Sequence, residues 1–324
     1  MRIGVTGATG FIGRVLMNEL LVQGHSVRVL VRRKASFLEG GDLEIQLGDI
    51  TSPADVSLFC EGMDQVYHLA GMVLIGPGKE DELHLVNTIG TKLIGEACLA
   101  KGVKRLTYCS SINAIQKPEG KTTWNERCPL ALDDKAGYNR TKAAAEQELL
   151  ELARKGLDVV IVNPTGVIGP EDHGPTLAGE NLLDFYHGRV PATASGGFNF
   201  VDVRDVVQGM MAAMEKGRTG ERYILGGHYR KLREMARSVS QLAGRKPPRL
   251  NLPVWVLKAI YPLVSTWSRI SRKDAPYTLE MLNSTLKGEL ISIEKAEMEL
   301  GYSPRPFEET LTDTLNWFER NNYH

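Results

Sequence analysis

Short runs rich in β-branched residues alternate with longer helical patterns through the first 170 residues of the chain. This alternation predicts βαβ units, which build a parallel sheet with helices on both of its faces. The runs lie at residues 2–6, 26–31, 43–47, 65–69, 105–109 and 158–162. We therefore expect an α/β fold with a Rossmann-type, doubly wound parallel sheet, in which ligands bind at the carboxyl ends of the strands.

The pattern changes after Gly169. Segments rich in glycine and proline follow, and then come one strand-like run at 221–225 and several helical patterns. The helical patterns lie at residues 202–214, 231–243, 253–271 and 306–320. We expect a dinucleotide-binding Rossmann domain over residues 1–169. A smaller, mostly helical substrate-binding region would cover residues 170–324, with some elements returning to the main body.

The overall composition gives no sign of a strongly charged partner. Lysine and arginine total 39, as do aspartate and glutamate, so we expect neither nucleic acid nor a charged surface as partner. The histidines and cysteines show no metal-binding spacing, and we assign no metal. The chain begins with a strand-like run in place of a secretory leader, so we expect a cytoplasmic protein.

The longest apolar stretch covers residues 253–267 and contains Lys258 and Pro262. It is shorter than the roughly 20 residues that a membrane span requires. The stretch predicts an amphipathic helix that packs on the body of the protein or lines a pocket. Its aromatic and basic residues would also suit attachment to a membrane interface, which is the alternative; we do not expect a membrane partner.

A glycine triplet, G-x-x-G-x-x-G, follows the first predicted strand and precedes a predicted helix at residues 11–22. Glycines at this point allow a tight turn and let the backbone approach a pyrophosphate, whose charge the helix N-terminus favours. The loop lacks the G-K-[ST] ending of a nucleoside-triphosphate loop. It predicts dinucleotide binding. The residues expected to contact the cofactor here are Gly7, Thr9, Gly10, Phe11, Ile12 and Gly13.

The second predicted strand ends in V-R-R-K, where a chain that selects NAD usually carries an acidic residue for the ribose hydroxyl. Arg32 or Arg33 could instead bind a 2′-phosphate through charge-assisted hydrogen bonds. We therefore expect NADP(H) to be preferred over NAD(H), with Arg32 the stronger candidate. The alternative is an exposed basic corner without a ligand.

Two further strand ends carry candidate cofactor contacts. Asp49 and Ile50 follow the third predicted strand, and the Asp49 carboxylate could accept a hydrogen bond from the adenine amino group. Leu69, Ala70 and Gly71 follow the fourth, where small residues let the backbone pass close to the cofactor. Either segment alone could be an ordinary loop, but their positions at successive strand ends favour a shared ligand.

The fifth predicted strand runs into C-S-S, which places Ser110 and Ser111 at the carboxyl edge of the sheet. Tyr138 and Lys142 lie four residues apart at the start of the helix before the sixth strand, and therefore share one helix face. In isolation such a pair is typical of an ordinary helix surface. Together with a dinucleotide turn and a serine at a strand end, it indicates a catalytic site.

These residue types suit the reduction of a carbonyl group. While a hydride arrives, the developing alkoxide needs a proton, which a phenol can supply. A lysine ammonium about 4–6 Å away would favour the phenolate by roughly 3–4 kcal/mol, or about two pKa units, and burial would offset part of this. We expect Tyr138 to be the acid/base, Lys142 to tune it and bind the nicotinamide ribose, and Ser111 to hold the substrate oxygen.

Six motifs resemble one known group of enzymes: T-G-A-T-G-F-I-G, H-L-A-G, C-S-S, Y-N-R-T-K, N-P-T-G-V-I-G-P and, near the C-terminus, G-Y-S-P-R-P-F-E-E-T-L. This group is the extended short-chain dehydrogenase/reductase superfamily of the NAD-dependent epimerase/dehydratase type. Within it, the chain is most similar to the dihydroflavonol-4-reductase-like and 3β-hydroxysteroid-dehydrogenase-like branches. The likeness covers the whole chain.

The resemblance implies that Ser111, Tyr138 and Lys142 are catalytic, that Asn87 lies near the active site, and that Pro164 and Val167 contact the nicotinamide end. One departure is informative. The chain reads I-N-A-I-Q after the serine, where sugar-nucleotide enzymes usually have a run such as A-x-V-Y-G. Many relatives form dimers through the helices around residues 80–100 and 134–154, so a homodimer and a monomer are both open.

Three functions are consistent with the sequence. The first is an NADP(H)-dependent oxidoreductase that interconverts a ketone and a secondary alcohol, acting on a small molecule of apolar character. The second is a sugar-nucleotide epimerase or dehydratase. The third is a non-catalytic NADP(H)-binding redox sensor, although such proteins typically lose the tyrosine or the lysine. The identity of the substrate is not readable from any motif.

Overall fold

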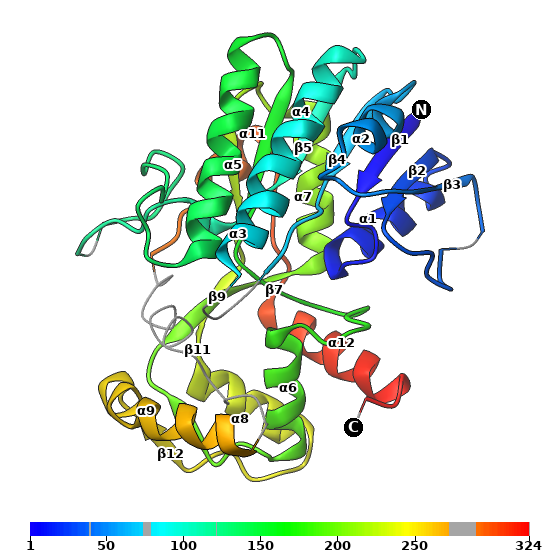
Figure 1. Cartoon of the computed structure of the whole chain (residues 1–324). Coiled ribbons are helices and arrows are strands. Elements are labelled where there is room, and N and C mark those ends of the chain that lie inside the picture. Colours follow the sequence, from blue (N-terminus) through cyan, green and yellow to red (C-terminus); the bar gives the residue numbers. More distant parts are fainter. Residues whose placement is uncertain (39, 74–78, 121, 272–289, 324) are drawn as a thin grey trace. The chain divides into compact units, whose positions relative to one another are not determined.

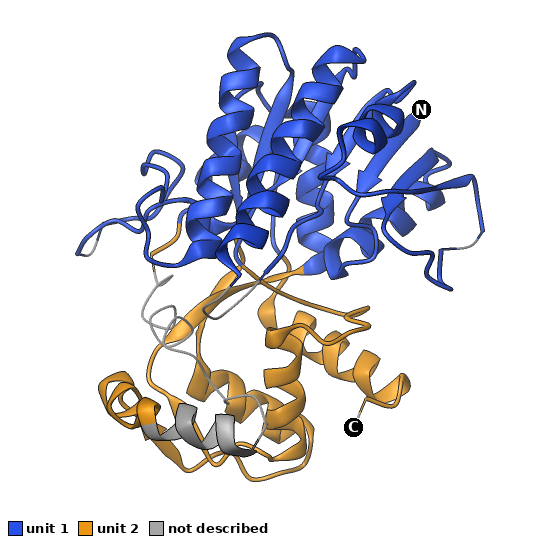
Figure 2. Cartoon of the chain, in the orientation of Figure 1, with its two compact units in different colours: residues 1–165, 203–225, 292–304 blue, residues 166–202, 226–291, 305–324 orange. Residues whose placement is uncertain are grey.

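The computed structural model describes residues 1–38, 40–73, 79–120, 122–271 and 290–323. It divides into two compact units, each assembled from separate parts of the chain (Figure 2). Unit 1 comprises residues 1–165, 203–225 and 292–304. Unit 2 comprises residues 166–202, 226–291 and 305–324.

Unit 1 contains a seven-stranded parallel sheet in the order β10-β6-β5-β4-β1-β2-β3 (Figure 1). The strands are β1 (Arg2–Thr6), β2 (Ser26–Val31), β3 (Leu43–Leu47), β4 (Gln65–His68), β5 (Arg105–Cys109), β6 (Val159–Pro164) and β10 (Arg222–Leu225). The first six correspond to the predicted β-branched runs, and β10 to the strand-like run at 221–225. The predicted Rossmann-type sheet is therefore confirmed.

The helices of unit 1 cover both faces of this sheet. They are α1 (Phe11–Val22), α2 (Pro53–Cys60), α3 (Glu80–Leu83), the π-helix η1 (His84–Gly90), α4 (Thr91–Ala100), the 3-10 helix η2 (Ile112–Ala114), α5 (Gly137–Arg154), α7 (Val203–Lys216) and α11 (Glu294–Leu300). Crossovers between parallel strands are right-handed. Because the chain runs from β1 towards β3 and then returns to β4, β5 and β6, α1 lies on one face and α2, α4 and α5 on the other. The reversal between β1 and β4 is where such sheets bind ligands.

The face that carries α2, α4 and α5 holds the largest part of the core. Phe59 of α2, Ile94 of α4 and Leu149 of α5 pack there in one buried cluster with strand residues such as Leu106. On the opposite face of the sheet, α7 contacts α1 and lies against β5 and β6. Strands covered on both faces are apolar throughout, as β6 illustrates with its uniformly buried V-V-I-V run.

Unit 2 combines two small sheets with helices. A three-stranded sheet has the order β11-β9-β7 and a two-stranded one pairs β12 with β8. The strands are β7 (Gly166–Ile168), β8 (Ala192–Ala194), β9 (Gly197–Asp202), β11 (His228–Lys231) and β12 (Leu250–Leu252), and the helices are α6 (Leu177–His187), α8 (Leu232–Leu242), α9 (Val254–Ser271) and α12 (Phe307–Arg320). Three of these helices match predicted helical patterns, whereas the five strands were not predicted.

The apolar stretch at residues 253–267 lies in α9. Val254 and Leu257 are buried against Leu252 and Ala194 of unit 2, whereas Trp255 is 72% exposed. The side chain of Trp267 is outside the described residues. In the part of the chain that the structure describes, no helix is both long enough and apolar enough to cross a membrane.

Candidate active site

The turn after β1 has the shape that a pyrophosphate requires. Gly7 has a φ of +75°, and a side chain there would come within 2.6 Å of the Ala70 amide nitrogen. A side chain at Gly13 would overlap the carbonyl oxygen of Gly7. α1 has no side-chain cap and no acidic residue in its first turn, so its positive end is open to an anion. These backbone features fit the pyrophosphate of a dinucleotide.

The other residues expected to contact the cofactor in this turn lie at its surface. The amide of Gly10 donates to the carbonyl of Gly7 at 2.9 Å and closes the turn. Thr9 and Gly10 are exposed, and Phe11 and Ile12 are half-buried in the first turn of α1. All four therefore surround the N-terminus to which a phosphate would bind.

Arg32 and Arg33 follow β2 directly and are both exposed. At the end of β3, Asp49 is half-buried, and one of its carboxylate oxygens accepts hydrogen bonds from the amide (2.9 Å) and hydroxyl (2.8 Å) of Thr51. Ile50 is buried and close to η1. The guanidinium groups and this carboxylate are thus at the carboxyl ends of neighbouring strands, where the adenosine half of a dinucleotide would lie.

The loop after β4 lies against the glycine turn. A side chain at Gly7 would come within 2.9 Å of the Leu69 carbonyl oxygen, and the Ala70 amide donates to the Thr6 hydroxyl at 3.2 Å. A side chain at Gly71 would lie 3.8 Å from Lys142 Nζ. The small residues of this loop therefore keep the space between the glycine turn and the lysine open.

Asn87 links this loop to α5 through side-chain hydrogen bonds. Its side chain is 1% exposed, accepts from the Met72 amide (2.7 Å), and donates to the Met72 carbonyl (3.0 Å) and to the Thr141 hydroxyl (3.2 Å). The resemblance implied that Asn87 lies near the active site. The structure places it there as a link between backbone and helix, with its amide group occupied by protein partners.

The three residues predicted to be catalytic lie together. α5 carries Tyr138 and Lys142 in its first two turns. Ser111 caps the N-terminus of η2, where its hydroxyl accepts from the Asn113 amide at 3.2 Å. The Ser111 hydroxyl and the Lys142 ammonium both lie close enough to the Tyr138 phenol to lower its pKa. Lys142 is 4% exposed, which leaves its charge almost without water.

The pKa of the Tyr138 phenol differs from the expectation. Burial raises it, whereas the Lys142 charge and the nearby Ser111 hydroxyl lower it, and the net pKa is above the ordinary value. This direction is opposite to the sequence-based estimate, in which burial offset only part of the lysine effect. Burial outweighs the lysine because a phenolate in this site loses most of its hydration.

Lys142 has two acceptors that sequence reasoning missed. Its Nζ donates to the Tyr108 hydroxyl at 2.8 Å and to the Cys109 carbonyl at 2.9 Å. Tyr108 is fully buried in β5. A sequence signal exists, because a tyrosine in a central strand, directly before C-S-S, must place its hydroxyl in the core, where it needs a polar partner.

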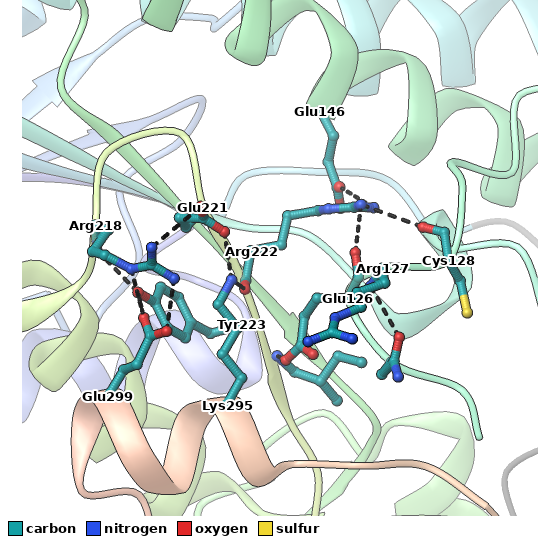
Figure 3. Close-up of polar contacts among 12 residues, drawn as sticks. Glu126, Arg127, Cys128, Glu146, Arg218, Glu221, Arg222, Tyr223, Lys295 and Glu299 are labelled. Atoms are coloured by element: carbon teal, nitrogen blue, oxygen red, sulfur yellow. Dashed lines mark hydrogen bonds and ion pairs between the residues drawn. The ribbon is translucent and has the colours of Figure 1, made fainter.

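A buried carboxylate lies one turn beyond Lys142. Glu146 accepts from Asn163 at 2.6 Å, and the same amide donates to the Ser111 carbonyl at 3.0 Å. Arg222 of β10 lies 3.8 Å from Glu146 and donates to the Glu126 carbonyl at 2.7 Å (Figure 3). The four-residue spacing from tyrosine to lysine to glutamate was the available signal, because it puts a carboxylate on a buried helix face.

Two predicted contacts lie after the sixth strand. Pro164 ends β6 in unit 1 and is buried, and Val167 lies in β7 of unit 2 and is half-buried.

Among the described residues, no group of three or more His, Cys, Asp or Glu side chains is arranged to hold a metal ion.

Comparison with known proteins identifies the family. The model of the NAD dependent epimerase/dehydratase family matches residues 3–226. The chain belongs to this family. It is thus an oxidoreductase of the extended short-chain dehydrogenase/reductase type with a nicotinamide dinucleotide cofactor, and the resemblance inferred from its motifs is confirmed.

Members of the epimerase/dehydratase family align with almost the whole chain. Sterol demethylase protein B of Methylococcus capsulatus is 34% identical over 97% of both chains. A 3-beta-hydroxysteroid dehydrogenase of Mycolicibacterium neoaurum is 27% identical over 94% of this chain and 87% of its own. Among solved structures, gox2253 superimposes with a TM-score of 0.86 at 34% identity over 98% of both chains.

Proposed function

We propose that the protein is an NADP(H)-dependent oxidoreductase that interconverts a ketone and a secondary alcohol. The observation that carries this proposal is the position of the Tyr138 phenol beside the Ser111 hydroxyl and the buried Lys142 ammonium, both of which lower its pKa. A serine hydroxyl and a phenol placed side by side can both reach a single substrate oxygen. This is the arrangement that protonation of an alkoxide requires.

Each of the three side chains has a separate task in this mechanism. The cofactor, when bound, supplies the hydride for reduction or accepts it in oxidation. Ser111 donates a hydrogen bond to the substrate oxygen and fixes its position. Tyr138 gives its proton to that oxygen as negative charge develops, and Lys142 stabilises the resulting phenolate by its fixed positive charge. For alcohol oxidation the phenolate takes the proton back.

The role of Tyr138 is tested by turnover of NADPH with a panel of ketones. We expect Tyr138→Phe to lower kcat/KM by about 10³-fold or more, because positioned proton transfer typically contributes about 10²–10⁴ and the phenol also binds the oxygen. Its affinity for the cofactor should change little. Activity that survives in Tyr138→Phe would refute the role assigned to this residue.

The preference for NADP(H) rests on Arg32 and Arg33, which replace the acidic residue that would bind the ribose of NAD. Fluorescence titration with NADPH and NADH measures it directly. We expect tighter binding of NADPH and, in Arg32→Ala, a loss of about tenfold to a hundredfold for NADPH alone, as a charge-assisted hydrogen bond predicts. Arg33→Ala tests the second candidate in the same titration and should have the smaller effect. Equal or tighter binding of NADH by the unmodified protein would contradict the preference.

An apolar substrate is proposed from two observations. The relatives named above include a sterol demethylase protein and a 3-beta-hydroxysteroid dehydrogenase. The chain also departs from the run that follows the serine in sugar-nucleotide enzymes. In the ketone panel, large ring ketones should therefore react faster than small polar ones. Tightly bound cofactor that is never consumed, together with conversion of a nucleotide sugar, would instead support the epimerase alternative.

A further inference from the structure

The buried ammonium of Lys142 depends on acceptors from β5. A charge out of contact with water is costly unless it is hydrogen-bonded. Nζ donates to Tyr108 and to the Cys109 carbonyl, and it also lies 4.4 Å from the centre of the Tyr108 ring. Two of its three N–H donors are thus fixed by one strand, and among the described residues no third acceptor is in contact. The third donor remains for a ligand.

The hydrogen-bonding roles around Tyr108 have one consistent arrangement. The Thr91 hydroxyl must donate to the Asn87 carbonyl at 2.6 Å, because a carbonyl can only accept. Thr91 therefore accepts from His68 Nε2, at 2.9 Å. The Lys142 ammonium can only donate, so the Tyr108 oxygen accepts from it.

His68 completes this network at the cofactor loops. Burial, and then the Lys142 charge, lowers the pKa of His68 to about 3, so the ring is neutral. With its proton on Nε2, Nδ1 accepts from the Thr6 hydroxyl at 2.6 Å, and Thr6 accepts from the Ala70 amide. The ring also stacks on Tyr108 with 5.4 Å between centroids. The stack of His68 on Tyr108, together with these hydrogen bonds, therefore connects Lys142 to the loop after β4 and to the end of β1.

We propose that Tyr108 is a positioning residue that holds the Lys142 ammonium through its hydroxyl oxygen. The proposal rests on the proposed function, in which Lys142 tunes Tyr138 and binds the cofactor ribose. Without the hydroxyl, the ammonium loses one of its two protein acceptors and its fixed position. Both of its tasks then weaken together, although Lys142 itself is unchanged.

The test is Tyr108→Phe, which keeps the ring and removes only the acceptor. The measurements use whichever of NADPH and NADH binds more tightly. We expect the cofactor Kd to rise about tenfold and kcat/KM at pH 7 to fall about tenfold to a hundredfold, which is the range for loss of a hydrogen bond to a charged group. In the reduction direction, the fall of kcat/KM at alkaline pH should shift to higher pH, because the phenol of Tyr138 loses part of the lysine effect. The other titratable neighbour of this phenol, the Cys109 thiol, has a pKa raised by burial to about 11 and is intact in the variant.

Tyr223→Phe is the matched control. Tyr223 is also fully buried in unit 1, and its hydroxyl donates to Glu299 at 2.6 Å and accepts from the Arg218 amide at 3.0 Å, away from Lys142 (Figure 3). Loss of this hydroxyl should lower the free energy of unfolding. The cofactor Kd should stay within about twofold of that of the unmodified protein, and the pH profile of kcat/KM should not shift. The same effect in Tyr108→Phe and Tyr223→Phe would overturn the proposal.

Thr91 provides a second pair in case Tyr108→Phe does not fold. Thr91→Val removes the hydroxyl that holds the His68 ring, which stacks on Tyr108, and should raise the cofactor Kd. Thr91→Ser keeps this hydroxyl and should leave the Kd unchanged. Equal Kd values in the two variants would overturn the proposal. The titrations need no turnover, so they decide it even if Tyr138→Phe remains active and the proposed proton transfer fails.

Discussion

At the scale of single residues, Gly13 is a position of the cofactor turn where one added methyl group has a large predicted effect. Its Cβ would overlap the Gly7 carbonyl, which is backbone and cannot rotate away. We expect Gly13→Ala to displace α1 from the loop, to lower the free energy of unfolding by about 1–3 kcal/mol, and to abolish cofactor binding. Denaturant unfolding and NADPH titration measure the two effects.

Substitutions at two other glycines serve as comparisons for Gly13→Ala. At Gly10 the nearest atom to an added Cβ would be the Gly7 carbonyl oxygen at 3.3 Å, and at Gly174 nothing lies within 4 Å. The loss of cofactor affinity should therefore be smaller for Gly10→Ala and absent for Gly174→Ala. Equal losses in Gly13→Ala and Gly174→Ala would show that the close approach to Gly7 is not the cause.

Glu146 gives a pH-dependent prediction at the same scale. Burial raises its pKa, against the lowering effect of Arg222 and of its hydrogen bonds, so the fold favours the protonated carboxyl. This contribution to stability is complete below the unfolded pKa of about 4.5 and is lost as pH rises through the folded pKa. Glu146→Gln has no such titration. Its stability relative to the unmodified protein should therefore increase between pH 4.5 and pH 8 in urea unfolding.

The exposed Glu151, on the same helix, is the control for this prediction. Glu151→Gln should show no comparable change with pH. A difference between Glu146→Gln and the unmodified protein that is independent of pH would contradict the raised pKa.

The candidate site could be predicted from sequence where chemistry follows a fixed spacing. The glycine triplet and the tyrosine–lysine pair have such spacing, and the structure brings Tyr138 to Ser111 beside Lys142. The supporting residues have none. Thr91 and His68 reach Tyr108 only because α4, β4 and β5 pack together, and such contacts between distant segments leave no local pattern.

At the scale of elements, the C-terminal end of α7 depends on one side chain of β5. Arg105 donates to the Met214 carbonyl (3.1 Å) and the Gly217 carbonyl (2.9 Å), and it pairs with Asp158 at 2.9 Å. Arg105 reaches the two carbonyls through Nη1 and Asp158 through Nε and Nη2, whereas the donors of a lysine all lie on one nitrogen and cannot span these positions. Arg105→Lys should lower the free energy of unfolding by about 1.5–3 kcal/mol, the value of a hydrogen bond to a charged group.

Arg154→Lys is the matched control, because Arg154 is exposed at the end of α5. It should change the free energy of unfolding by less than about 0.5 kcal/mol. Similar losses in the two lysine variants would mean that Arg105 does not fix the end of α7.

The elements of the sheet were predictable because buried parallel strands are continuous β-branched runs, as in β2 and β6. The strands of unit 2 were not. β7, β8 and β12 have three residues each, too few for any periodicity, and β9 contains the G-F-N-F run that reads as irregular. Their pairing with distant segments determines their conformation more than their own sequence does.

At the scale of the whole molecule, the cofactor-binding unit is not a continuous piece of chain. α7, β10 and α11 belong to unit 1 but follow residue 202. A fragment of residues 1–169 would lack them and expose the surfaces of β5 and β6 that α7 covers. Five large apolar side chains of α7 are buried: Val203, Val206, Val207, Met210 and Met214. Their burial is worth about 8–15 kcal/mol, comparable to the entire stability of about 5–15 kcal/mol typical of a protein.

We therefore expect the fragment of residues 1–169 not to fold. Its circular dichroism should change gradually with urea, whereas the full chain should unfold cooperatively. A chain that joins residues 1–165, 203–225 and 292–304 through flexible linkers restores α7, β10 and α11, and should recover a cooperative transition and NADPH binding. Cooperative unfolding of the 1–169 fragment would contradict the prediction, because it would mean that the sheet is stable without the strand and helices supplied by the second half of the chain.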